Sequence, residues 1–433
     1  MPSKSPLSQR RSATSRPWPR NDGLRAVVNV TALLIKPFAA LRPAPGRADE
    51  VVAPPYDVIT TEEARARAAH RPWDFLHVSR PEIDLPAGAD PHGDDAYAGA
   101  AAAFRRMQEE GVLIRDPEPA FYAYRITDGG HVQTGLGAAA CVPAYADGRI
   151  RRHELTRPAK EQDRARQIAA VGAHTGPVFV VHRPNAVVSA ALDAATARAP
   201  DADVALDGAR HQVWAIEAAA AMSGLAQAFE AMARLYVADG HHRAAAAVRV
   251  HAARPAADRF LVVSFPADQV RILDYNRVVR DLKGMTPEAF VEAARARFDV
   301  EPCDHPVRPD RAGVFGMVVG GGWHRLASRS GASEAAGPLA RLDVTRLTED
   351  LLAPVLGIGD VRTDPRIDFV GGSRGLEALD SMVRSGDWAV AFSLHPTSLD
   401  DLMAVADAGE VMPPKSTWFD PKLADGLLSL PLD

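Results

Sequence analysis

The stretch RLYVADGHHRAAAA at 234–247 places a carboxylate, two imidazoles and a guanidinium at one junction. The apolar run ends at Asp239, and Gly240 permits a tight turn there. A helix that begins at about His241 would leave its first backbone N–H groups without partners, so they would attract an anion such as phosphate. Arg243 could bind two phosphate oxygens, and Asp239 could cap the helix, hold Mg²⁺ or bind a substrate hydroxyl.

The two histidines of this stretch do not form a chelate by themselves. His241 and His242 would lie about 100° apart around a helix, so one can face the site while the other faces the core. A second interpretation needs no ligand: Asp239 is an ordinary helix cap, and the His and Arg side chains lie on the surface. The junction alone leaves both interpretations open.

A second polar stretch, HELTRPAKEQDR at 153–164, begins like a zinc-binding helix. It differs from the HExxH motif because Arg157 stands at the second histidine position. Glu154 could act as a general base, and Lys160 could bind phosphate. The alternative is the exposed, salt-bridged start of a helix.

A third stretch, VMPPKSTWFDPK at 411–422, resembles the end of a phosphate-binding P-loop at Lys415 and Ser416. Pro414 stands where the P-loop needs glycine, and no strand-to-helix pattern follows, so we exclude a Walker A motif. The two prolines still make a rigid loop that presents Lys415, with Ser416 and Thr417 beside it.

Alternating strand and helix patterns surround these stretches and would position them. Apolar runs predict strands at 120–126, 176–182, 234–238, 259–265 and 270–279, with a shorter strand at 51–60. Periodic segments predict helices at 61–70, 94–113, 158–173, 186–198, 215–232 and 241–253. This alternation predicts an α+β (mixed α/β) fold with mixed strand direction.

Composition and charge exclude several classes of protein. The net charge is −5, so the chain lacks the overall positive charge that holds nucleic acid, and we expect no nucleic-acid partner. No run of about 18 apolar residues occurs, so no membrane span is expected. Cys141 and Cys303 lie outside any CxxC pair, which fits a reducing cytoplasm. The basic, Ser- and Pro-rich residues 1–30 are expected to form a disordered tail.

Four motifs in this order, VVAPPYDVI, HELTRPAKEQDR, LYVADGHHR and MPPKSTWFDPKL, resemble a bacterial and archaeal family known as domain of unknown function 1015. The resemblance covers residues 31–433. It draws attention to further polar residues within the shared motifs, which are Tyr56, Asp57, His153 and Arg164.

The DGHHR turn is also similar to the phosphate-binding turn of the ParB and sulfiredoxin superfamily, which includes partition proteins, sulfiredoxins and free-serine kinases. That resemblance implies nucleotide phosphates at Gly240, His241 and Arg243. His241 stands where sulfiredoxins need a reactive cysteine, so cysteine reduction is not expected. The serine-kinase branch uses a carboxylate to activate the serine hydroxyl, and by their chemistry Glu154 and Asp239 are the candidates.

These patterns and resemblances predict a nucleotide-dependent phosphotransferase that acts on a small hydroxylated metabolite, with ATP or ADP and Mg²⁺ as cofactors. Apart from Asp239 as a possible Mg²⁺ ligand, no metal-binding residue is expected. The alternatives are a nucleotide-binding regulatory protein without turnover and a nucleotide or phosphate hydrolase. The candidate catalytic residues are Asp239, Glu154 and His242. The candidate phosphate-binding residues are Gly240, His241, Arg243, Lys160, Lys415, Ser416 and Thr417.

A change of composition near 300, at EPCDHPVRPDR, predicts a division of the chain. We expect a ParB/sulfiredoxin-like nucleotide-binding core at 31–300, elaborated with extra strands and helices. A C-terminal α+β region at 301–433 is expected to pack on that core.

Overall fold

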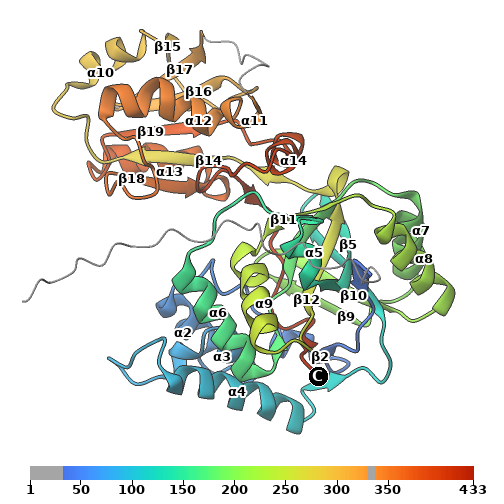
Figure 1. Cartoon of the computed structure of the whole chain (residues 1–433). Helices are drawn as coiled ribbons and strands as arrows, with labels where there is room; N and C mark the ends of the chain where they lie inside the picture. Colours follow the sequence, from blue (N-terminus) through green and yellow to red (C-terminus); the bar gives the residue numbers. More distant parts are fainter. Residues whose placement is uncertain (1–32, 330–336) are drawn as a thin grey trace, which may run out of the picture. The chain divides into compact units, whose positions relative to one another are not determined.

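A mixed sheet forms the centre of the first part of the chain in the computed structural model, which describes residues 33–329 and 337–433 (Figure 1). Across the sheet, eight of the described strands follow the order β6 (Ile150–Arg151), β11 (Leu235–Asp239), β8 (Val178–His182), β12 (Arg259–Pro266), β5 (His131–Cys141), β4 (Phe121–Asp128), β10 (Ala209–Ile216) and β9 (Ala202–Leu206). A ninth, β1 (Ile35–Lys36), pairs with β5. The pairs β6–β11 and β8–β12 are parallel, and the other pairs are antiparallel.

Both faces of this sheet are buried, and the side chains of β4 show why. Tyr122 and Tyr124 belong to one hydrophobic cluster, whereas Phe121 and Ala123 belong to another. Successive side chains of a strand point to opposite faces, so the two clusters lie on the two faces of the sheet. A strand buried on both faces reads as a continuous apolar run, as VFVVH of β8 does.

Helices follow from local signals at their ends. The helix α2 (Thr61–Ala68) begins with a capping box, in which the Glu63 N–H donates to Thr60 Oγ1 and the Thr60 N–H donates to the Glu63 carboxylate. The helix α6 (Pro158–Val171) begins with proline and ends at the left-handed Gly172. It packs against α9 (His241–Ala253) and α4 (Asp94–Glu109). Further described helices are α1 (Ala48–Val51), α3 (Leu76–Ser79), α5 (Val142–Ala146), α7 (Ala186–Thr196) and α8 (Ala219–Glu230).

A second, antiparallel sheet uses six described strands from the later part of the chain (Figure 1). Their order is β15 (Phe298–Cys303), β17 (Gly322–Ser328), β16 (Val314–Val319), β19 (Val390–Leu394), β14 (Tyr275–Val279) and β18 (Ile367–Gly371). The associated helices are α10 (Pro287–Ala294), α11 (Gly337–Ala340), α12 (Asp343–Leu347), α13 (Gly375–Arg384) and α14 (Leu399–Asp407). A π-helix, η4 (Thr348–Leu356), continues α12.

The C-terminal segment 412–433 makes backbone contacts with parts of the chain that lie far from it in the sequence. Its strand β20 (Trp418–Phe419) pairs with β13 (Ile272–Leu273), and β21 (Leu430–Pro431) pairs with β7 (Ala173–His174). Between them, Asp425 exchanges backbone hydrogen bonds with Ala53. Together with a bridge between Ser429 and Leu41, these contacts hold the segment by backbone pairing to several distant parts of the chain.

The mixed α/β fold class is confirmed, but individual elements differ from expectation. The expected strand at 51–60 is wrong: α1 ends at Val51, and only Ala53 makes a bridge. The expected single strand at 270–279 is divided between β13 and β14, which belong to different sheets. The hairpin of β9 and β10 was not expected, although Asp207-Gly208 between alternating apolar residues is a standard hairpin signal.

The domain division at residue 300 stays a prediction. The second sheet already takes in β14 at Tyr275–Val279, and residues Leu34–Asp433 form one compact unit. The expected disordered tail lies outside the described residues. Within the described part of the chain, the helices are all too short or too polar to cross a membrane.

Candidate functional site

The polar turn lies between β11 and α9. Gly240 adopts the left-handed conformation with φ of +88°, which a residue with a Cβ rarely adopts. The Arg243 and Ala244 N–H groups donate to the Gly240 carbonyl, so the earlier N–H groups of His241 and His242 precede the first helical hydrogen bonds. The N-terminal end of α9 is therefore suited to binding an anion.

The interpretation of Asp239 as an ordinary cap is wrong. The N-cap residue of α9 is Gly240, and no side chain caps the helix. His241 and Arg243 are both buried instead of lying on the surface. Asp239 Oδ1 accepts a hydrogen bond from the Gly240 N–H, which stabilises the turn itself.

Asp239 forms an ion pair with Lys422 from the C-terminal segment. The Lys422 ammonium donates to Asp239 Oδ2 at 2.9 Å. Burial by itself raises the pKa of Asp239, but Lys422 and Arg243 outweigh burial and hold that pKa well below its ordinary value. Asp239 is therefore an ionised, weakly basic carboxylate.

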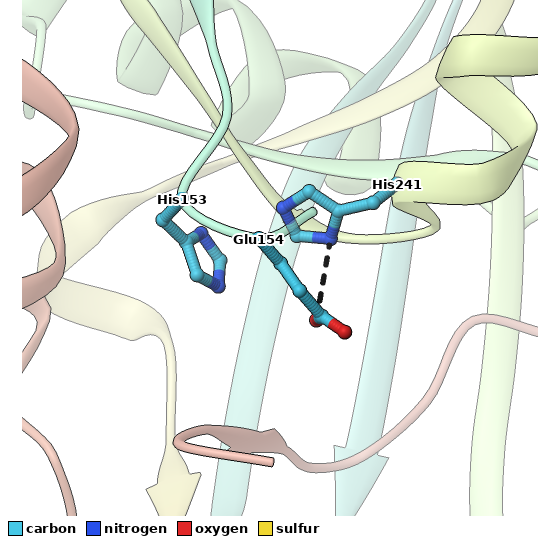
Figure 2. A group of neighbouring side chains, drawn as sticks. All are labelled: His153, Glu154 and His241. Carbon is cyan, nitrogen blue, oxygen red and sulfur yellow. Dashed lines mark ion pairs between the residues drawn. The ribbon is translucent and has the colours of Figure 1, made fainter. Parts of the chain in front are cut away.

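Three candidate ligands meet beside this pair, as Figure 2 shows for His153, Glu154 and His241. The two imidazole rings are perpendicular with their centroids 4.5 Å apart. The Nδ1 atom of His241 lies 3.9 Å from Glu154 Oε2, and one donor atom from each of the three residues lies within 4.8 Å of the other two. This group could hold a metal ion, which the sequence did not indicate because it lacks the HExxH spacing.

Burial sets the protonation of the same three residues. It lowers the pKa of His153 to about 4 and holds the pKa of His241 well below its ordinary value, so both rings are neutral. It also raises the pKa of Glu154, an effect that Lys415 opposes and Asp239 reinforces. The side chain of Glu154 nevertheless remains 38% exposed and can be reached from solvent.

His242 faces a different direction from His241, as the helical spacing predicts. Its Nε2 atom accepts a hydrogen bond from the Arg157 N–H at 3.2 Å, at the start of α6. Burial lowers the pKa of His242, and the nearby Lys160 ammonium lowers it further. Lys160 and His242 therefore lie on the α6 side of the turn.

The loop at 413–417 contacts the site through Thr417, and Lys415 lies near enough to lower the pKa of Glu154. Lys415 has a left-handed φ of +59°, and its ammonium lies 5.6 Å from the centroid of the Tyr275 ring. Thr417 Oγ1 lies 3.5 Å from His153 Nε2. Ser416 is buried and donates to the Pro413 carbonyl, so its hydroxyl stabilises the loop.

The Arg243 side chain contacts residues from other parts of the chain. Its guanidinium donates to the Pro177 carbonyl at 2.9 Å, lies 3.6 Å from Asp57 and stacks near the Tyr56 ring. Arg164 stacks on the same ring, with its guanidinium carbon 4.3 Å from the centroid. Tyr56, Arg164 and Arg243 border a cavity of about 30 Å³. The role of Arg243 as a phosphate ligand stays a prediction, because in this arrangement protein groups occupy its guanidinium.

Asp425 lines the same cavity and gives a prediction for stability. It is 1% exposed, and its Oδ1 atom has no hydrogen-bond partner among the described residues. Burial raises its pKa to about 7, against an ordinary value of about 3.9 in the unfolded chain. As the pH rises from about 4 to 7, the unfolded chain releases this proton first, so the carboxyl of Asp425 lowers the free energy of unfolding.

We expect Asp425→Asn to remove this loss of unfolding free energy at rising pH. Relative to the variant, the wild-type protein should lose about 2–4 kcal/mol of unfolding free energy between pH 4 and pH 7. Urea unfolding of both proteins at several pH values measures the difference. Parallel pH profiles of the two proteins would show that Asp425 does not titrate in this range.

The structure thus brings together residues from all three polar stretches. One group lies at the N-terminal end of α9 and consists of Glu154, Asp239, His241 and Lys415. A second group lies around the Arg243 guanidinium and consists of Tyr56, Asp57, Arg164 and Arg243. Sequence reasoning missed Lys422 and Asp425. Both lie in or directly after the shared motif MPPKSTWFDPKL, and that motif was the available signal.

Comparison with known proteins gives a family but no close relative. The family described as "Protein of unknown function (DUF1015)" matches residues 35–345. A search of curated proteins returned no match.

The chain shows distant similarity to solved structures. C-terminally truncated SbnI from Staphylococcus aureus is 15% identical, with 68% of this chain and 87% of that chain covered and a TM-score of 0.38. A free serine kinase in complex with AMP is 13% identical, with 66% and 86% covered and a TM-score of 0.34. A conserved hypothetical protein from Pyrococcus furiosus is 13% identical, with 71% and 98% covered and a TM-score of 0.35. At such low similarity, function has to be argued from the geometry of the site.

Proposed function

The chain belongs to the DUF1015 family, and we propose that this member is a nucleotide-dependent phosphotransferase that acts on a small hydroxylated metabolite. The observation that carries the proposal is the position of Glu154. Its partly exposed carboxylate lies beside His241, the first residue of α9, and near the ammonium groups of Lys415 and Lys422. The candidate proton acceptor Glu154 therefore lies next to the N-terminal end of α9, which is suited to binding an anion.

The phosphate end of the site would consist of backbone and lysine donors. The N–H groups of His241 and His242 lie at the positive end of α9, where a phosphate is favoured. Lys422 and Lys415 would add positive charge, because phosphoryl transfer depends mainly on positioning and on neutralising charge. The resemblance of the DGHHR turn to nucleotide-binding turns supports ATP or ADP as the source of the phosphoryl group.

Glu154 is the better of the two candidates for the base. Asp239 is paired with Lys422, and its lowered pKa makes it a poor proton acceptor. Among the described residues, no lysine or arginine forms an ion pair with Glu154, and its contact at 3.9 Å is with the neutral ring of His241. It could accept the proton of an acceptor hydroxyl as that hydroxyl attacks the terminal phosphate of the nucleotide.

Mg²⁺ would arrive with the nucleotide in this proposal. Asp239, the possible Mg²⁺ ligand that the sequence suggested, forms an ion pair with Lys422, which favours Mg²⁺ binding mainly through the nucleotide. Mg²⁺ usually keeps several waters and binds through substrate phosphates with one or two carboxylates.

Incubation of the full chain with ATP or ADP, Mg²⁺ and a mixture of amino and hydroxy acids tests the proposal. A new phosphorylated product, detected by mass spectrometry, is the expected result. Nucleotide binding by calorimetry without any product would instead support a binding protein without turnover. Release of free phosphate without an acceptor would support a hydrolase.

A further inference from the structure

The buried imidazole of His241 is not satisfied by the protein around it. The residue is 4% exposed, and its Nε2 atom has no hydrogen-bond partner in the described ranges. Its Nδ1 atom faces Glu154 Oε2 across 3.9 Å, which is too long for a hydrogen bond. Buried polar groups without partners are rare, because each costs about 1–3 kcal/mol.

The neighbouring imidazole has a similar defect. His153 is 2% exposed, and its Nδ1 atom has no hydrogen-bond partner in the described part of the chain. Its Nε2 atom makes a long contact of 3.5 Å with Thr417. One donor atom from each of these two buried rings and one from Glu154 lie within 4.8 Å of one another (Figure 2).

We propose that His153, Glu154 and His241 together bind one divalent transition-metal ion, of which Zn²⁺ is the representative. Two imidazoles and a carboxylate are a common ligand set for such ions, and a fourth position would remain for water or substrate. Tetrahedral zinc places its ligand atoms about 3.3 Å apart at ordinary bond lengths. At their widest separation of up to 4.8 Å, the donor atoms here would need to close by up to about 1.5 Å.

The ligand types separate this site from a Mg²⁺ site. Mg²⁺ prefers oxygen ligands, whereas imidazole suits zinc and its neighbours. Glu154 is the partly exposed member of the three ligands, so the site is open on its side. A bound ion would face the N-terminal end of α9. There it would polarise a phosphate or hydroxyl oxygen, and the free oxygen of Glu154 could still accept a proton. Metal binding itself does not depend on the proposed transferase activity.

Titration of the chelator-treated full chain with Zn²⁺ and Co²⁺ tests this site. One equivalent should bind, and Co²⁺ should give visible d–d absorption. Glu154→Gln is nearly isosteric at a partly exposed position, and it should weaken Zn²⁺ binding by about 100-fold. His241→Asn should do the same, with circular dichroism to verify folding. The control is His92→Asn, at a 66% exposed histidine outside the site, which should bind like the wild type.

Two results would overturn the proposal. The first is a folded wild-type protein that binds no equivalent of Zn²⁺ or Co²⁺. The second is unchanged affinity in Glu154→Gln, which would place any bound ion elsewhere. Because these experiments measure metal binding alone, their outcome does not depend on whether the protein transfers a phosphoryl group.

Discussion

Replacing Glu154 with glutamine is expected to lower the turnover of phosphoryl transfer by about 10²–10⁴-fold, the usual contribution of a positioned general base. Glutamine keeps the shape of the side chain but cannot accept the proton of the acceptor hydroxyl. Nucleotide affinity should change by less than about threefold, because the proposed phosphate donors lie on α9, Lys415 and Lys422. Turnover by product assay and affinity by calorimetry together check this split.

A neighbouring carboxylate supplies the control for this experiment. Glu161 on α6 is 16% exposed and forms an ion pair with Arg249. Glu161→Gln should therefore leave turnover within about threefold of the wild type. If Glu154→Gln turns over as fast as the wild type, Glu154 is not the base.

Replacing Lys422 with methionine is expected to affect both stability and ligand binding. Asp239 would keep its charge without the ammonium that now lies 2.9 Å away, and a partly buried carboxylate left unpaired costs about 2–3 kcal/mol. Nucleotide affinity should fall by about 10–100-fold, because a charged donor to phosphate is lost. Urea unfolding and calorimetry measure the two effects separately.

The double variant Asp239→Asn with Lys422→Met separates the two roles of the lysine. Neither charge is unpaired in it, so most of the lost unfolding free energy should return. Nucleotide affinity should stay at least about tenfold weaker than in the wild type, because the phosphate still lacks its donor. Full recovery of affinity would show that Lys422 acts only on Asp239 and does not contact phosphate.

Features that depend on neighbouring residues could be predicted from the sequence. The order of β11, Gly240 and α9 follows from an apolar run, a glycine and a run of alanines. The different directions of His241 and His242 follow from helical spacing, and each ring has its own neighbours in the structure. The hairpin of β9 and β10 was missed, but Asp207-Gly208 carried a local signal for it.

Features that depend on distant pairing could not be predicted in this way. Lys422 and Asp239 are 183 residues apart, and their contact exists because β20 pairs with β13 and Asp425 with Ala53. The same pairing brings the loop of Lys415 to His153. Propensity and periodicity are local quantities, whereas strand pairing across the chain depends on global packing.

By itself, the sequence determined the family and the mixed α/β class, and it predicted a turn suited to an anion, because motif identity and short-range periodicity carry that information. Only the tertiary structure decided the chemistry of each charge. It paired Asp239 with Lys422 and turned Arg243 toward Pro177. It also set Glu154 beside two buried imidazoles, and the charge and basicity of such groups depend on burial and on neighbours that folding brings from distant parts of the chain.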